Sequence, residues 1–527
     1  MRAFIAGAAM AFVCLVTTAG AQQSGGTLRI IHRDSPASLS IHEEATNSVV
    51  TPAMAMFNNL AMFDQHKTQN TMDGIVPDLA ESWTWSDDRT RLTFKLRDGV
   101  TWHDGKAFTA DDVKCTFDLL TGRAKERLRL NARAGWYSNL MDVTTNGKLE
   151  VTLVLNRPQP SILSMVASGY TPVYPCHVPP AKMRTDPIGT GPFMLKEFKR
   201  NELIRLVKNP NYWKRGQPYL DAIEFTIIPN RSTAMLSFVS GRADMTFPYE
   251  MTIPLVRDIK AQMPSAVCEV VTTNASTNLL VNQKVAPFND PEVRQAVALT
   301  LDRGDFIRIM SEGQNHVGGA LLPTPEGVWG LPEEILRTIP GYGGDVAGSR
   351  RQAQEIMKRQ GYSPENTIKI KVSTRNIGAY RDAAVILIDQ LKHVYIEAEL
   401  EVIDTAIWHA KVAKRDYQIG LNVTGSGLDD PDQQFYENYA CGSQRNYTDY
   451  CNKEVEALVE QQSRELDIVK RKKLVWEIDR RIQMDLARPI IMHNRGGTCM
   501  TQKVHAVTIM VNSVYNGWRF EDAWLEK

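Results

Sequence analysis

The sequence predicts an α/β fold that is divided into more than one lobe. At 527 residues the chain exceeds a single domain of about 150 residues. Strand-type and helix-type hydrophobic patterns both occur along its whole length, which favours mixed α/β lobes. No Gly/Ser-rich tether separates them, so we expect the lobes to share crossing strands rather than hang on a flexible linker.

The first 21 residues have the pattern of a secretory signal peptide. Met1-Arg2 is positively charged, residues 3–16 are mostly apolar, and Ala19-Gly20-Ala21 is a small-residue cleavage site. Cys14 follows Val13 rather than the small residue of a lipoprotein signal, so a lipid anchor is not expected. No later segment has the length and apolar character of a membrane span. The mature chain, from residue 22, is therefore expected to be exported and soluble.

Four segments show the period-2 alternation of half-buried strands. They are centred on residues 27–30, 92–96, 368–372 and 396–402. Three helices are predicted, and two of them carry capping signals at their N-termini. Asp290 precedes Pro291 at the first, Asn452 caps the second, and the third spans about residues 467–486. Lys470-Arg471-Lys472-Lys473 lies on this third helix and is interpreted as a solvated face.

The charge balance argues against a nucleic-acid partner. Lys and Arg number 61 and Asp and Glu number 60, whereas nucleic-acid binders carry a strongly basic surface.

The cysteines suggest one disulfide. Cys441 and Cys451 lie close together in a chain expected to reach an oxidising compartment, so we predict that they pair; two buried thiols are the alternative. Cys115, Cys176, Cys268 and Cys499 cannot be paired from the sequence.

Catalytic and nucleotide-binding motifs were sought and not found. Gly425-Ser426-Gly427 lacks the outer glycines of a nucleophile elbow. His42-Glu43 lacks the second histidine of a zinc-protease helix. The glycine-lysine pairs lack the spacing of a phosphate-binding loop. No cofactor or metal site is therefore expected, although a catalytic triad can escape sequence patterns.

Several long segments resemble the bacterial family 5 extracellular solute-binding proteins, the dipeptide- and oligopeptide-type receptors of ABC importers. Residues 73–120 read DGIVPDLAESWTWSDDRTRLTFKLRDGVTWHDGKAFTADDVKCTFDLL, and residues 288–303 read FNDPEVRQAVALTLDR. Residues 187–245 include Gly189-Thr190-Gly191-Pro192-Phe193, and the segment from Asp429 through the Cys441–Cys451 loop is also similar. The resemblance covers nearly all of the mature chain.

The resemblance implies a two-lobed periplasmic-binding-protein fold, type II and cluster C-like, with an extra domain on one lobe. On this basis residues 22–58, 186–268 and 495–527 form lobe I, residues 59–185 the extra domain, and residues 269–494 lobe II. The lobes would close over a ligand by hinge motion, and a membrane permease would recognise the closed form. A periplasmic monomer is expected.

The resemblance also suggests ligand-binding residues. Peptide receptors of this kind use an arginine for the terminal carboxylate and an aspartate for the ammonium, which match Arg375 and Asp430 here. Trp408 and Trp136 could supply flat apolar walls, and Gly425, Ser426 and Gly427 could bring backbone close to a ligand. The alternatives are structural ion pairs, core tryptophans and a plain loop.

The leading hypothesis is a periplasmic receptor of an ABC importer for a short peptide or related small polar solute. Residues 420–424 lack the tryptophan that peptide-binding relatives commonly have before the acidic loop. A non-peptide cargo, such as an aromatic acid, opine, sugar or metal complex, therefore stays open within the family. A secreted hydrolase with an unrecognised active site is the alternative from another class.

Overall fold

The computed structural model describes residues 22–44 and 46–527. The expected signal peptide and Cys14 lie outside these residues. Within the described part, no helix combines the length and the apolar character needed to cross a lipid bilayer.

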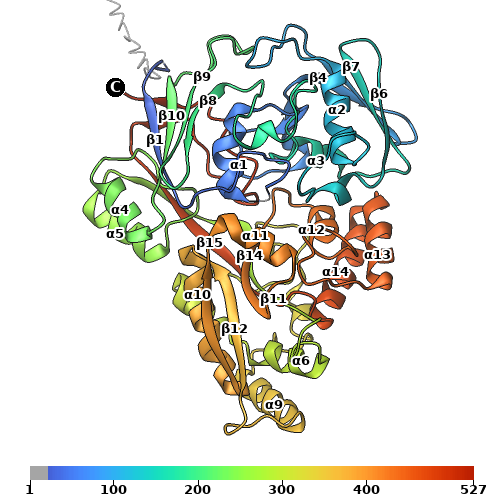
Figure 1. Ribbon diagram of the computed structural model, residues 1–527, viewed down its shortest axis with the longest axis vertical. Helices are drawn as coiled ribbons and strands as arrows, with labels where there is room; N and C mark the ends of the chain where they lie inside the picture. Colours follow the sequence, from blue (N-terminus) through green and yellow to red (C-terminus); the bar gives the residue numbers. More distant parts are fainter. Residues whose placement is uncertain (1–21, 45) are drawn as a thin grey trace, which may run out of the picture.

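Lobe I, at the top left of Figure 1, is built around a four-stranded sheet of order β1-β10-β9-β8. β1 runs parallel to β10, and the other pairs are antiparallel. Its strands are β1 (Thr27–His32), β8 (Phe193–Lys199), β9 (Leu203–Lys208) and β10 (Ala222–Ile227), and its helices are α1 (Asn47–Ala53), α4 (Arg231–Val239) and α5 (Ile253–Gln262). Two short ladders add β2 (Ala61–Phe63) with β3 (Ile75–Pro77) and β16 (Val504–His505) with β17 (Trp524–Leu525).

A second four-stranded sheet, of order β4-β5-β7-β6, lies beside lobe I at the top right of Figure 1. It is antiparallel throughout. Its elements are β4 (Ala80–Trp85), β5 (Arg91–Leu96), β6 (Leu140–Thr145), β7 (Glu150–Leu155), α2 (Ala110–Leu120) and α3 (Ile162–Ala167). The start of α2 follows from its sequence, because Thr109 and Asp112 form a capping box.

Lobe II contains a five-stranded sheet of order β13-β12-β14-β11-β15. β12 pairs in parallel with β13 and β14, whereas β11 is antiparallel to β14 and β15. The strands are β11 (Val267–Val281), β12 (Ile368–Arg375), β13 (Ile396–Ile403), β14 (Ile419–Gly425) and β15 (Ile490–Met500). The helices are α6 (Pro291–Thr300), α7 (Arg303–Ser311), α8 (Glu333–Leu336), α9 (Val346–Arg359), α10 (Gly378–Leu391), α11 (Thr405–Ala413), α12 (Pro431–Asn438), α13 (Lys453–Arg464) and α14 (Ile468–Met484).

Short 3-10 helices also occur in the described chain. They are η1 (Met54–Met56), η2 (Met72–Gly74), η3 (Ala134–Tyr137), η4 (Lys182–Arg184) and η5 (Lys392–Val394).

The predicted strands and helices are confirmed at β1, β5, β12, β13, α6, α13 and α14. The caps also form as expected: Asp290 accepts from the amide of Glu292, and Asn452 from that of Glu454. The interpretation of the basic run as a solvated face is wrong for Arg471, whose side chain is only 5% exposed. The reason is tertiary, because α14 turns this residue toward an acidic partner on α12 rather than toward solvent.

β11 and β15 connect the lobes. Near one end, Cys268 of β11 faces Cys499 of β15, and Met500 bridges to Met245 beside the lobe I sheet. Further along, β11 pairs with β14 inside the lobe II sheet. Both strands therefore run from lobe I into lobe II (Figure 1). The two paired strands cross without a loose linker and place their middle residues between the lobes.

Candidate functional site

A cavity lies between the lobes where β11 and β15 cross from one to the other. The space between atoms there is about 1120 Å³, including the part open to solvent. Its walls include Arg33, Arg231 and Glu250 from lobe I, Thr277 and Arg495 from the crossing strands, and Arg375, Asn422 and Arg445 from lobe II.

Arg375 lies in the cavity wall, at the end of β12, but its charge is already paired. Its Nη2 is 3.0 Å from Oδ2 of Asp34, which follows β1 in lobe I. Arg375 also donates to the hydroxyls of Thr405 and Tyr380. Burial alone would raise the pKa of Asp34, but the charges of Arg375 and Arg33 outweigh it and hold that pKa far below its usual value. The pair is therefore ionised and joins the two lobes.

Three more charged groups of lobe I form a second cluster in the wall. Glu250 accepts from Arg33 at 3.3 Å and from Arg231 at 2.8 Å. The two guanidinium groups share this carboxylate, and each has a second acidic neighbour. Arg33 lies 3.7 Å from Asp34, and Arg231 lies 3.5 Å from Asp382 of α10.

Arg495 on β15 has a different environment. Its Nη2 donates to the carbonyl oxygen of Val270 at 3.2 Å, and its Nε is buried without a hydrogen-bond partner. Among residues 22–44 and 46–527, no acidic side chain forms an ion pair with it. Arg495 is thus a cavity guanidinium that has no ion-pair partner among the described residues.

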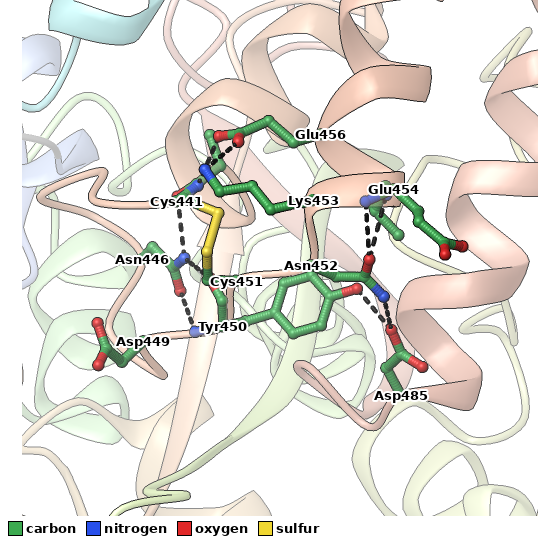
Figure 2. The surroundings of a disulfide bond; sticks show 12 residues. Cys441, Asn446, Asp449, Tyr450, Cys451, Asn452, Lys453, Glu454, Glu456 and Asp485 are labelled. Atoms are coloured by element: carbon green, nitrogen blue, oxygen red, sulfur yellow. Dashed lines mark hydrogen bonds and ion pairs between the residues drawn. A yellow bond between two sulfur atoms is a disulfide. The ribbon is translucent and has the colours of Figure 1, made fainter.

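Arg445 and Tyr447 reach the cavity from the loop that the Cys441–Cys451 disulfide closes. The structure confirms this predicted disulfide. Figure 2 shows how the loop is held: Asn446 donates to the carbonyl oxygens of Ala440 and Tyr450, and the Tyr450 hydroxyl donates to Asp485. Arg445 is buried against Glu437. The loop is therefore an ordered part of the site.

His409, on α11, adds no positive charge to the cavity at neutral pH. Burial lowers its pKa well below the ordinary value, and the charges of Arg375 and Arg445 lower it further.

The glycine-serine segment reaches the site only at its first residue. Gly425 lies in the cavity wall, where an added Cβ would come 2.6 Å from the hydroxyl oxygen of Tyr515. Ser426 is fully buried, with its hydroxyl 2.7 Å from the Leu428 carbonyl oxygen. The Gly427 amide donates to the side chain of Gln433. Ser426 and Gly427 thus shape the loop rather than face the cavity.

Asp430 lies outside this cavity. Its carboxylate caps α12 by accepting from the Asp432 amide at 2.9 Å. It also accepts two hydrogen bonds from Arg471, at 2.8 and 2.9 Å. This placement offers no free carboxylate to a ligand ammonium.

Trp408 and Trp136 are both fully buried and lie outside the cavity wall. Trp408 packs in the cluster with Leu280 and Tyr417. Trp136 meets Tyr170 edge to face, with ring centroids 6.2 Å apart. Both side chains belong to the packed core.

Sequence reasoning missed Asp34, Glu250, Arg445 and Arg495 as cavity or cavity-pairing residues. No local pattern marks them, because they lie on different strands and loops and only the folded chain brings them together around one cavity. The alternation of β15 alone cannot show which of its residues lies between two lobes.

Together, the fold and this cavity define a two-lobed solute-binding protein. The model of the bacterial extracellular solute-binding proteins, family 5 Middle, matches residues 74–446. The chain belongs to this family.

Known proteins of similar sequence and of similar fold include peptide receptors and a receptor solved with a different solute. The probable di/tripeptide-binding protein 5 of Pseudomonas aeruginosa is 25% identical over 470 residues, covering 83% of this chain and 84% of the relative. The DppA periplasmic binding protein of Helicobacter pylori, in complex with the peptide STSA, has a TM-score of 0.84 at 21% identity and covers 96% of this chain and 99% of its own. AgaA of A. tumefacien R10, in complex with agropinic acid, has a TM-score of 0.81 at 22% identity. The match covers 95% of this chain and 99% of AgaA.

Proposed function

We propose that this protein is the periplasmic substrate-binding component of an ABC importer and captures a short peptide or related small polar solute. The observation that carries the proposal is the cavity between the two lobes, reached by charged side chains from both. A ligand that contacts both walls binds the closed arrangement better than the open one, which shifts the population toward the closed form.

The family supports delivery to a membrane permease and a periplasmic location, and the signal sequence and the monomeric state are further parts of the proposal. The protein delivers its solute to a membrane permease, which distinguishes the closed form from the open one. It reaches the periplasm through the signal sequence expected at residues 1–21 and acts as a monomer. The solute leaves chemically unchanged.

A non-peptide solute is the second candidate, and one observation favours it. Arg375 and Asp430, the residues expected to hold the two ends of a peptide, are already engaged with Asp34 and Arg471. AgaA, a protein of similar fold, was solved with agropinic acid rather than a peptide.

Native mass spectrometry of the mature protein purified from periplasm tests the function. We expect a bound small molecule at one copy per chain, and small-angle scattering should show a more compact shape with it than without it. Recovery of the solute unchanged after prolonged incubation is expected, whereas accumulation of a product would support the hydrolase alternative. An identical shape in both states would contradict the proposal.

A further inference from the structure

We infer that the solute is a small organic acid with a net negative charge and that Arg495 binds one of its carboxylates. This inference rests on the proposed function and specifies its ligand class.

The charge of the cavity wall is the first observation. The cavity wall contains one acidic residue, Glu250, and five arginines, which are Arg33, Arg231, Arg375, Arg445 and Arg495. Just behind the wall, Asp34 and Glu437 neutralise Arg375 and Arg445. Glu250 is shared by Arg33 and Arg231. Arg231 also lies 3.5 Å from Asp382 of α10, and Arg33 lies 3.7 Å from Asp34. Four acids thus face five guanidinium groups, and the site carries an excess of one positive charge.

The state of the acids is the second observation. Glu250, Asp34 and Glu437 are each engaged with at least one arginine, and the side chains of all three are at most 7% exposed. A ligand ammonium entering the cavity would have to displace one of these guanidinium groups. An ammonium buried without a partner is very costly. The wall therefore disfavours a zwitterionic peptide, whose ammonium needs such a partner.

Arg495 is the group that can receive an anion. Its Nε has no partner, and Nη2 donates only to a main-chain carbonyl oxygen. A planar guanidinium with free donors binds a carboxylate bidentately. Glu326 accepts a hydrogen bond from Thr272, the residue opposite Arg495 on β11. Glu326 forms no ion pair with Arg495 and lies outside the cavity wall.

The backbone holds Arg495 in position. The amide of Arg495 donates a hydrogen bond to Oδ1 of Asn315 at 2.8 Å. The next residue is Gly496, and a Cβ at this position would come 2.1 Å from the carbonyl oxygen of Tyr249. The strand therefore lies tightly against lobe I at this point. An anion bound by Arg495 would contact the strand that joins the lobes, where it can favour closure.

Thermal unfolding with matched probes tests the ligand class. The mature protein, freed of bound solute, is mixed with citrate, glutarate, N-acetylglutamate or agropinic acid. Glutaramide, which has the glutarate skeleton without charge, and zwitterionic dialanine are the controls. At 100 times its Kd an acid should raise Tm by about 3 °C, and the two controls should leave Tm unchanged.

Calorimetry on variants tests Arg495. Arg495→Gln should weaken binding of the stabilising acid at least tenfold, as expected for a lost charge-assisted contact, and Arg495→Lys should retain part of the affinity. Arg337→Gln, at a surface arginine 68% exposed, is the matched control and should bind like the original protein. Unchanged Tm of each variant without ligand verifies that it is folded.

The outcomes separate the inference from the proposed function. Stabilisation by dialanine or glutaramide alone overturns the inference and leaves the importer function standing. Acid binding that is unaffected by Arg495→Gln overturns the role of Arg495. If no acid stabilises the protein, the inference is overturned. The importer function fails as well only if native mass spectrometry of protein from periplasm also finds no bound solute.

Discussion

Asp34 and Arg375 are 341 residues apart in sequence and form a buried ion pair across the two lobes. The nitrogen and oxygen atoms are 3.0 Å apart, and the side chains are only 7% and 3% exposed. The hydroxyls of Thr405 and Ser48 also donate to Asp34. Three hydrogen bonds therefore hold this carboxylate, and two of them come from Arg375 and Thr405 of lobe II.

Arg375→Ala should strongly destabilise the closed form. Removing one partner leaves Asp34 as a buried charge without its main partner, which costs about 3–5 kcal/mol. Urea unfolding should show this loss, and small-angle scattering should show a more open protein. Asp34→Asn with Arg375→Gln, which removes both charges, should recover part of the stability; a double variant as unstable as the sum of the single variants would contradict the coupling.

Asp430→Ala should lower stability but leave ligand affinity nearly unchanged. The substitution removes an N-cap of α12, worth about 1 kcal/mol, and deprives buried Arg471 of its bidentate partner. Asp430→Asn keeps the cap and serves as the control. An affinity loss above tenfold in a folded Asp430→Ala protein would instead place this carboxylate in contact with the solute.

The disulfides should contribute unequally to stability. Cys268–Cys499 spans 231 residues, whereas Cys441–Cys451 spans 10. In the chain-entropy model, replacing both cysteines by serine should cost about 5 kcal/mol for the long loop and about 2–3 kcal/mol for the short one. Calorimetric unfolding of the two double variants measures the difference; equal losses would show that effects other than loop closure dominate.

Asp479 should make the protein less stable as the pH rises. Burial raises its pKa to about 6, although it accepts from the Ala320 amide. The unfolded value is about 3.9, so between these values the folded state binds more protons and loses stability with increasing pH. From pH 4 to 7 the group should remove roughly 1–3 kcal/mol.

Asp479→Asn keeps an oxygen acceptor for Ala320 and should abolish this contribution. Urea unfolding at both pH values compares the variant with the original protein. Identical pH dependence in the two would show that Asp479 is already ionised at pH 4.

Gly425→Ala should oppose closure. The new Cβ would lie 2.6 Å from the Tyr515 hydroxyl oxygen and 2.9 Å from a Val514 methyl carbon, so the side chains of lobe I must move away from β14. We expect weaker solute binding and a more open scattering profile. Gly442→Ala is a poor control because Gly442 has a φ of 74°, but Gly343→Ala, whose added Cβ would have its nearest neighbour at 3.6 Å, should behave like the original protein.

Local features of the fold could be predicted from the sequence. The alternation in residues 368–372 and the Asp290-Pro291 cap act within one element, so β12 and α6 form where expected. The Cys441–Cys451 pairing was also accessible, because a separation of 10 residues brings the thiols together in any compact loop. Long family motifs indicated a two-lobed receptor.

What only the tertiary structure decided is which residues meet across the cavity. Arg375 was expected there from the sequence, but its partner Asp34 comes from the segment that follows the first strand of the other lobe. Asp430 pairs with Arg471, and Cys268 with Cys499, through packing of elements far apart in the chain. Hydrophobic periodicity and capping depend on neighbours a few residues away, whereas an ion pair or a free guanidinium such as Arg495 depends on how distant strands are brought together.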